Sequence, residues 1–127
     1  SYNDLEFVLP IHPNPAVKKH QHLLSNVTVV DPMEHGQFIS ELAACKYIIT
    51  DSGGVQEEAA FLKKPCIVCR DFTERVEGLG TFSVLCASPK ELFGLVDWAT
   101  GINLDYKQCP YGDGRSSQYI CDLLNNI

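Results

Sequence analysis

The chain has 127 residues, which is enough for one domain with a single hydrophobic core. Hydrophobic residues make up 45% and charged residues 20%, proportions that are typical of an ordinary globular protein. The net charge of −6, without a lysine and arginine cluster, argues against a nucleic-acid partner. No apolar run approaches the roughly 20 residues that a membrane span needs, and no signal peptide is recognisable at Ser1.

The cysteines favour free thiols over disulfides or a metal site. Four of the six lie in apolar patterns, where a free cysteine packs as a small hydrophobic residue. Cys66 and Cys69 have the CxxC spacing of redox and zinc sites, but residues three apart on a strand point to opposite faces. No second Cys/His pair is suitably spaced. We therefore expect no metal, no cofactor and a reducing, cytoplasmic compartment.

Short apolar strands alternate with helices along the first part of the chain. Strands are expected over residues 5–11 and 27–30, and helices over residues 16–24 and 34–45. The first strand is mostly apolar, which predicts that both of its faces are covered. It ends at His12, before two prolines, and Pro15 suits the first turn of the following helix.

The same alternation continues to the end of the chain. Strands are expected over residues 47–49, 66–69 and 81–85, and helices over residues 55–62, 88–100 and 115–125. Ser88, Pro89 and Glu91 form a helix-start signal, with a capping serine and a glutamate three residues later. Strands that alternate with helices predict βαβ units, and therefore an α/β fold with a parallel sheet flanked by helices.

A glycine turn lies between a predicted strand and a predicted helix. Ser52 is a residue type that caps helices, and it is followed by Gly53 and Gly54, which would let an anion approach the backbone closely. A strand, a turn and a helix N-terminus together aim free N–H groups and the positive end of a dipole at one point. The turn is neither a Walker loop nor a GxGxxG fingerprint. It is therefore interpreted as an anion site or as a tight structural turn.

Three polar segments follow strands of the predicted sheet. They are His12, residues 51–54 and residues 70–78. In parallel α/β sheets, ligands bind beyond the carboxyl ends of the strands. The sequence therefore predicts that these segments share one rim of the sheet and form a ligand site there.

An ordered set of motifs resembles one known family. The motifs are His12-Pro13-Asn14-Pro15, Thr50 to Glu58, Lys64-Pro65, Arg70-Asp71, Thr73-Glu74-Arg75, Glu77, Gly80-Thr81 and Tyr111-Gly112-Asp113-Gly114. In this order and spacing they resemble the UDP-N-acetylglucosamine 2-epimerases. The resemblance implies two Rossmann-like domains that face each other, as in GT-B glycosyltransferases. Residues 1–127 would be most of the carboxyl-terminal, nucleotide-binding domain, with the amino-terminal domain and one strand outside the chain.

The resemblance implies a binding role for several residues, with UDP or UDP-N-acetylglucosamine as the ligand. Ser52, Gly53 and Gly54 would hold the diphosphate through a hydroxyl and backbone amides. Glu58 would accept hydrogen bonds from the ribose hydroxyls, and Phe38 matches the position that lies against the uracil. The resemblance also implies a place in cell-surface polysaccharide biosynthesis.

The resemblance also implies catalytic support from two residues. Arg75 would neutralise the charge that grows on the phosphates as UDP leaves, and His12 would lie near the sugar or the phosphates. The implied reaction interconverts UDP-GlcNAc and UDP-ManNAc by elimination and re-addition of UDP. The carboxylates that move protons belong to the amino-terminal domain, so this chain is expected to bind its ligand without turnover.

Other interpretations stay open from the sequence. The chain could belong to a hydrolysing epimerase, a related glycosyltransferase or a non-catalytic nucleotide-sugar binding domain, and it could form a homodimer. Individual residues also have ordinary alternatives: Glu57 and Glu58 as a solvated helix start, Arg75 as a surface partner of Glu74 or Glu77, and His12 as a loop cap.

Overall fold

The computed structural model describes residues 4–127, so Ser1, where the predicted domain begins, lies outside the described residues. The described chain forms two compact units, one that extends to Phe38 and one from Ile39 to Ile127. None of the helices within residues 4–127 has the length and apolarity that crossing a bilayer requires.

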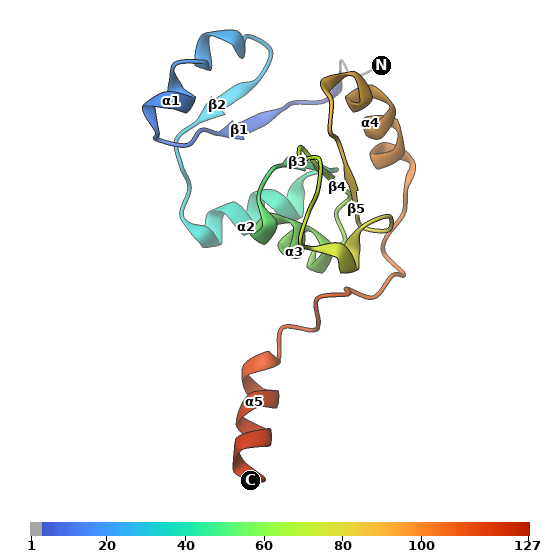
Figure 1. Cartoon of the computed structure of the whole chain (residues 1–127). Coiled ribbons are helices and arrows are strands. Elements are labelled where there is room, and N and C mark those ends of the chain that lie inside the picture. Colours follow the sequence, from blue (N-terminus) through green and yellow to red (C-terminus); the bar gives the residue numbers. More distant parts are fainter. Residues whose placement is uncertain (1–3) are drawn as a thin grey trace. The chain divides into compact units, whose positions relative to one another are not determined.

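The first unit is built on two parallel strands, β1 (Val8–Pro10) and β2 (Thr28–Val30) (Figure 1). A short helix, α1 (Pro15–Lys18), and a 3-10 turn (Gln21–Leu23) connect them. Pro15 lies in the first helical turn, as predicted, and the Asn14 side chain accepts a hydrogen bond from the Ala16 amide at 2.9 Å. The single helix expected over 16–24 is two shorter pieces. Neither piece buries a residue, and packing is what stabilises most helices of this length.

The first strand differs from the prediction in its length and its burial. Val8 and Leu9 are exposed, at 45% and 37% of their accessible surface. Coverage of both faces was therefore the wrong expectation. The physical reason is that β1 pairs with β2 alone among the described residues, and a two-stranded sheet covers little of its own surface.

The second unit begins within α2 (His35–Ala44) and contains a parallel sheet in the order β3-β4-β5. The strands are β3 (Ile48–Thr50), β4 (Cys66–Val68) and β5 (Ser83–Leu85). All three residues of the central strand β4 are buried, as its apolar run predicts. Parallel sheets with flanking helices confirm the predicted α/β, Rossmann-like fold class.

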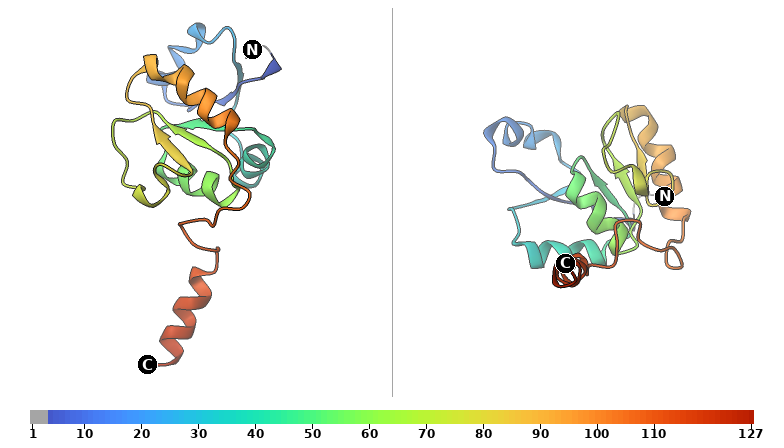
Figure 2. Two further views of the ribbon diagram at one scale, coloured as in Figure 1. Left: turned by 90° about the vertical axis from the view of Figure 1, so that its right-hand side faces the viewer. Right: turned by 60° about the horizontal axis from the view of Figure 1, so that its bottom comes forward.

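Two helices pack against β4 from different sides (Figures 1 and 2). Ile67 forms a buried cluster with Cys86 and with Val96 and Ala99 of α4 (Leu92–Gly101). The neighbouring residues of β4 point to the other face because side chains alternate along a strand. On that side, Ala60 of α3 (Gly53–Phe61) packs with Phe82 and Leu104. α3 is thereby packed against the sheet.

The predicted helix start at Ser88 is confirmed. The Ser88 hydroxyl accepts from the Lys90 amide at 3.4 Å, and the Glu91 carboxylate accepts from the Ser88 amide at 3.3 Å. A 3-10 turn (Pro89–Glu91) follows and leads into α4. The last helix, α5 (Ser116–Asn125), begins after a turn in which Gly112 and Gly114 have φ values of +101° and +81°. Glycine adopts such values without steric cost.

All six cysteines are free thiols. Burial raises the pKa of Cys66 to about 12, so its thiol is protonated at neutral pH. Cys69, its partner in the CxxC spacing, is exposed. Within residues 4–127, no three His, Cys, Asp or Glu side chains are grouped as a metal site would require.

Candidate functional site

The start of α3 is the centre of the candidate site. β3 ends at Thr50, and Ser52 is the N-cap of α3, with its hydroxyl accepting from the Val55 amide at 3.4 Å. The helix begins at Gly53 rather than at Val55, so the two glycines form its first turn. Amides of a first helical turn have no acceptor within the helix. Those of Gly53 and Gly54 can therefore bind an anion at the positive end of the helix dipole.

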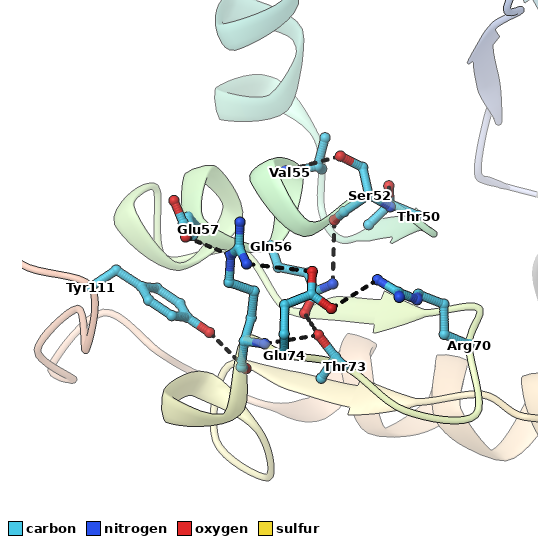
Figure 3. Close-up of polar contacts among 10 residues, drawn as sticks. Thr50, Ser52, Val55, Gln56, Glu57, Arg70, Thr73, Glu74 and Tyr111 are labelled. Carbon is cyan, nitrogen blue, oxygen red and sulfur yellow. Dashed lines mark hydrogen bonds and ion pairs between the residues drawn. The ribbon is translucent and has the colours of Figure 1, made fainter.

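The loop after β4 brings a cation to this helix start. A Cβ atom on Gly53 would lie 2.8 Å from Glu74 Oε1 and 3.4 Å from the Arg75 guanidinium carbon. Residues 51–54 and 70–78, which follow neighbouring strands, therefore meet at the carboxyl end of the β3-β4-β5 sheet, as predicted (Figure 3).

The Arg75 guanidinium is held between the carboxylates of Glu57 and Glu74, both of which are labelled in Figure 3. Its Nε lies 2.6 Å from Glu57 Oε1, and its Nη1 lies 3.4 Å from Glu74 Oε1. Glu74 also pairs with Arg70 at 3.3 Å. Its own backbone amide and these two arginines hold the pKa of Glu74 below its ordinary value. Glu74 was named from the sequence as an Arg75 partner, but Glu57 was interpreted only as a helix-start residue.

Buried polar contacts connect the helix start to residues 70–78, the loop after β4 that carries Arg75 (the Arg75 loop). The Thr73 hydroxyl donates to Gln56 Oε1 at 2.9 Å, and Gln56 Nε2 donates to the Ser52 carbonyl at 3.3 Å. Gln56 and Thr73 are only 2% and 6% exposed. Sequence reasoning gave neither residue a role. The position of Gln56 could have indicated a buried hydrogen bond. Gln56 shares a helix face with Ala59 and Ala60, and an amide on an apolar face needs a partner.

The hydroxyl of Tyr111 contacts the same loop from the far end of the sequence. It donates to the Arg75 carbonyl at 2.9 Å and accepts from the Gly78 amide at 3.1 Å. Burial raises the pKa of Tyr111, which keeps its hydroxyl protonated and able to donate. The motif that contains Tyr111 was noticed in the sequence as part of the family pattern, but Tyr111 itself was given no role.

Glu58 lies on another side of α3 from Gln56. It lines a mostly apolar cavity of about 260 Å³ between α3 and the loop before α5. The cavity is lined by Ile39, Glu57, Glu58, Phe61, Leu62, Cys109, Tyr111, Gly112 and Gly114. Glu57 connects this cavity with the site at the start of α3, because it both lines the cavity and pairs with Arg75.

His12 and Phe38 belong to the first unit, whereas the other predicted site residues belong to the second. His12 follows β1 and is exposed, and its Nδ1 accepts from the Asn14 amide at 3.1 Å. This contact is the loop-capping role that was the alternative for His12. Phe38 is half-buried on α2.

The fold and the helix start define a class of protein. A Rossmann-like α/β domain in which a capped helix start meets an arginine from the next loop is suited to binding an anionic ligand. The sequence model of the UDP-N-acetylglucosamine 2-epimerase family matches residues 1–125. The chain therefore belongs to this family, as its motifs predict.

Individual relatives agree with this assignment. The UDP-N-acetylglucosamine 2-epimerase of Bacillus subtilis (strain 168) is 37% identical over 97% of this chain and 35% of its own length. The Campylobacter jejuni enzyme of the same name is 34% identical over 95% of this chain and 34% of its own length. The chain thus spans about a third of the relatives that it matches.

Solved structures of the family have the same fold. The Methanocaldococcus jannaschii UDP-GlcNAc 2-epimerase, in complex with UDP-GlcNAc and UDP, superposes with a TM-score of 0.84 at 28% identity. The match covers 98% of this chain and 37% of the Methanocaldococcus jannaschii chain. The Neisseria meningitidis enzyme bound to UDP-GlcNAc gives a TM-score of 0.75 at 34% identity, over 99% of this chain and 38% of its own.

Proposed function

We propose that this chain is the nucleotide-binding part of a UDP-N-acetylglucosamine 2-epimerase and that it binds the UDP portion of UDP-GlcNAc. The observation that carries the proposal is the position of the Arg75 guanidinium beside Gly53, at the start of α3. A diphosphate there would accept hydrogen bonds from the amides of the first turn and from an arginine at once.

The remaining contacts to the nucleotide are proposed for four residues. Ser52 contributes its hydroxyl to the diphosphate, and Glu58 accepts from the ribose hydroxyls. Phe38 lies against the uracil, and His12 lies near the sugar or phosphates. The choice of ligand is supported by two solved relatives, which bind UDP-GlcNAc, one of them together with UDP.

The proposed reaction interconverts UDP-GlcNAc and UDP-ManNAc. A proton leaves C2 of the sugar as the C1–O bond to UDP breaks. UDP then adds back at C1 while a proton returns to C2 from the opposite face, which gives the epimer. Negative charge grows on the departing diphosphate, where the first-turn amides and the fixed donors of Arg75 stabilise it. The groups that move the proton are proposed to lie in the remaining two thirds of the full-length protein, in a second, facing domain.

Cytoplasmic activity is proposed on two grounds. Nucleotide sugars are the family's substrates by name, and all six cysteines of the chain are free thiols, as expected of a reducing compartment.

A thermal-shift titration of the chain tests the proposed ligand. UDP and UDP-GlcNAc are expected to raise the Tm, because a ligand that binds only the folded state stabilises it, whereas ADP and inorganic phosphate leave the Tm unchanged. A chain that no uridine nucleotide stabilises would contradict the proposal.

A matched pair of serine variants locates the site. Ser52→Ala removes a helix cap worth about 1 kcal/mol and also the proposed diphosphate contact, so both the Tm and the UDP-induced shift should fall. Ser88→Ala removes a comparable cap at the start of the segment that leads into α4. It should lower the Tm to a similar extent and leave the UDP-induced shift intact.

A further inference from the structure

The backbone of Arg75 is held by side chains at both its amide and its carbonyl. The Arg75 amide donates to the Thr73 hydroxyl at 3.1 Å, and the Arg75 carbonyl accepts from the Tyr111 hydroxyl at 2.9 Å (Figure 3). This segment lies between β4 and a short 3-10 turn (Val76–Gly78), outside any helix or strand ladder. Its backbone position therefore depends on contacts of this kind.

The contact at the amide end is continuous with the helix start. The Thr73 hydroxyl accepts from Arg75 and donates its own proton to Gln56, whose amide donates to the Ser52 carbonyl. Each polar group in this chain of bonds is paired, and the Gln56–Thr73 pair is buried. Arg75 is thus connected to the N-cap residue of α3 through two side chains.

The contact at the carbonyl end depends on a close approach. The Tyr111 hydroxyl also accepts from the Gly78 amide, so one phenol bridges two peptide groups of the Arg75 loop. A Cβ atom at Gly78 would lie 2.8 Å from the Tyr111 hydroxyl, so a side chain there would displace the phenol. The loop and the tyrosine fit each other only because residue 78 is glycine.

We propose that Tyr111 and the Gln56–Thr73 pair are positioning residues that fix the Arg75 backbone, so that its guanidinium stays beside the first turn of α3. This inference rests on the proposed function, in which Arg75 binds the diphosphate. The positioning residues act through Arg75 and not by touching the nucleotide. Their loss should therefore weaken UDP binding only as long as Arg75 is present.

A double-mutant cycle on the chain tests the inference by calorimetric titration with UDP. Tyr111→Phe deletes one hydroxyl without changing the shape of the ring, and we expect UDP affinity to fall about threefold to tenfold. In an Arg75→Met background the same substitution should cause no further loss. Tyr119→Phe is the control, because it removes a tyrosine hydrogen bond to Asp113 on the way into α5. It should leave UDP affinity unchanged.

A second pair of variants tests the amide end. Thr73→Val removes the hydroxyl and should weaken UDP binding, whereas Thr73→Ser keeps the hydroxyl and should restore it. Without nucleotide, amide hydrogen exchange should rise at Gly78 in Tyr111→Phe and at Arg75 in Thr73→Val.

The outcomes separate the two proposals. A wild-type chain that does not bind UDP contradicts the proposed function. UDP binding that is equally tight in wild type, Tyr111→Phe and Thr73→Val contradicts the positioning role alone. An equal loss of affinity with and without Arg75 contradicts it as well, because the residues would then act by another route. Unchanged exchange at both amides would show that the two hydrogen bonds do not hold the loop.

Discussion

At the scale of single residues, the site depends on where the Arg75 guanidinium lies. Glu57 and Glu74 hold it from two sides, and Gly53 leaves it the space to reach the start of α3. The guanidinium of Arg75 presents N–H donors in a planar arrangement that matches a phosphate. It can bind the ligand only if these donors face it. The residues around it therefore matter as much as its charge.

Gly53→Ala tests this packing. The new methyl group would meet the ends of the Glu74 and Arg75 side chains, which are flexible and can move aside at little cost. Alanine also suits a helix better than glycine does, by up to about 1 kcal/mol. We expect a Tm that does not fall and a UDP-induced shift that does, measured by the same thermal-shift titration.

Gly94→Ala is the matched control for this variant. Gly94 lies within α4, and apart from its chain neighbours and the backbone of its own helix no described atom lies within 4 Å of where its Cβ would be. The Tm should rise while the UDP-induced shift stays at its wild-type size. Equal UDP shifts in both glycine variants would contradict the close packing at Gly53.

At the scale of elements, β4 is the support of the site. It lies between β3 and β5 and is covered by α3 and α4, and its loop supplies Arg75. β3 pairs with β4 alone among the described strands, which leaves Ile49 38% exposed. Two isoleucines in register, Ile49 and Ile67, therefore lie in different surroundings, since Ile67 is fully buried.

This difference predicts unequal costs of truncation. Ile67→Ala should lower the free energy of unfolding by about 2–5 kcal/mol, because it leaves a cavity between β4 and α4. Ile49→Ala removes the same atoms from a partly exposed position and should cost clearly less. Urea unfolding of both variants measures the difference, and equal costs would show that β4 is not the centre of the core.

At the scale of the whole molecule, the chain spans about a third of its relatives. It contains the helix start and the arginine proposed for the diphosphate, whereas the proton-transfer carboxylates are proposed to lie in the rest of the full-length protein. This chain alone should therefore bind the ligand, whereas turnover should require the full-length protein.

We expect that the isolated chain does not epimerise UDP-GlcNAc, because no group in it is proposed to take the C2 proton. Incubation in heavy water, followed by mass spectrometry, should show no deuterium at C2 of the recovered nucleotide sugar. Detectable incorporation, or formation of UDP-ManNAc, would mean that proton-transfer groups are present within these 127 residues.

The sequence by itself determined the local features of this protein. The caps at Ser52 and Ser88, the burial of β4 and the alternation of strands and helices all follow from residues within a few positions of each other. The meeting of residues 51–54 with residues 70–78 could also be predicted, because neighbouring parallel strands end at the same rim. The ordered motifs identified the family.

Only the tertiary structure decided which side chains meet across long stretches of sequence. Tyr111 contacts the Arg75 carbonyl 36 residues away, and Thr73 pairs with Gln56 across 17. Such contacts depend on the paths of loops, which local propensity and periodicity do not specify. The exposure of β1 has the same origin, because an apolar pattern predicts that a strand can be covered but not which neighbours cover it.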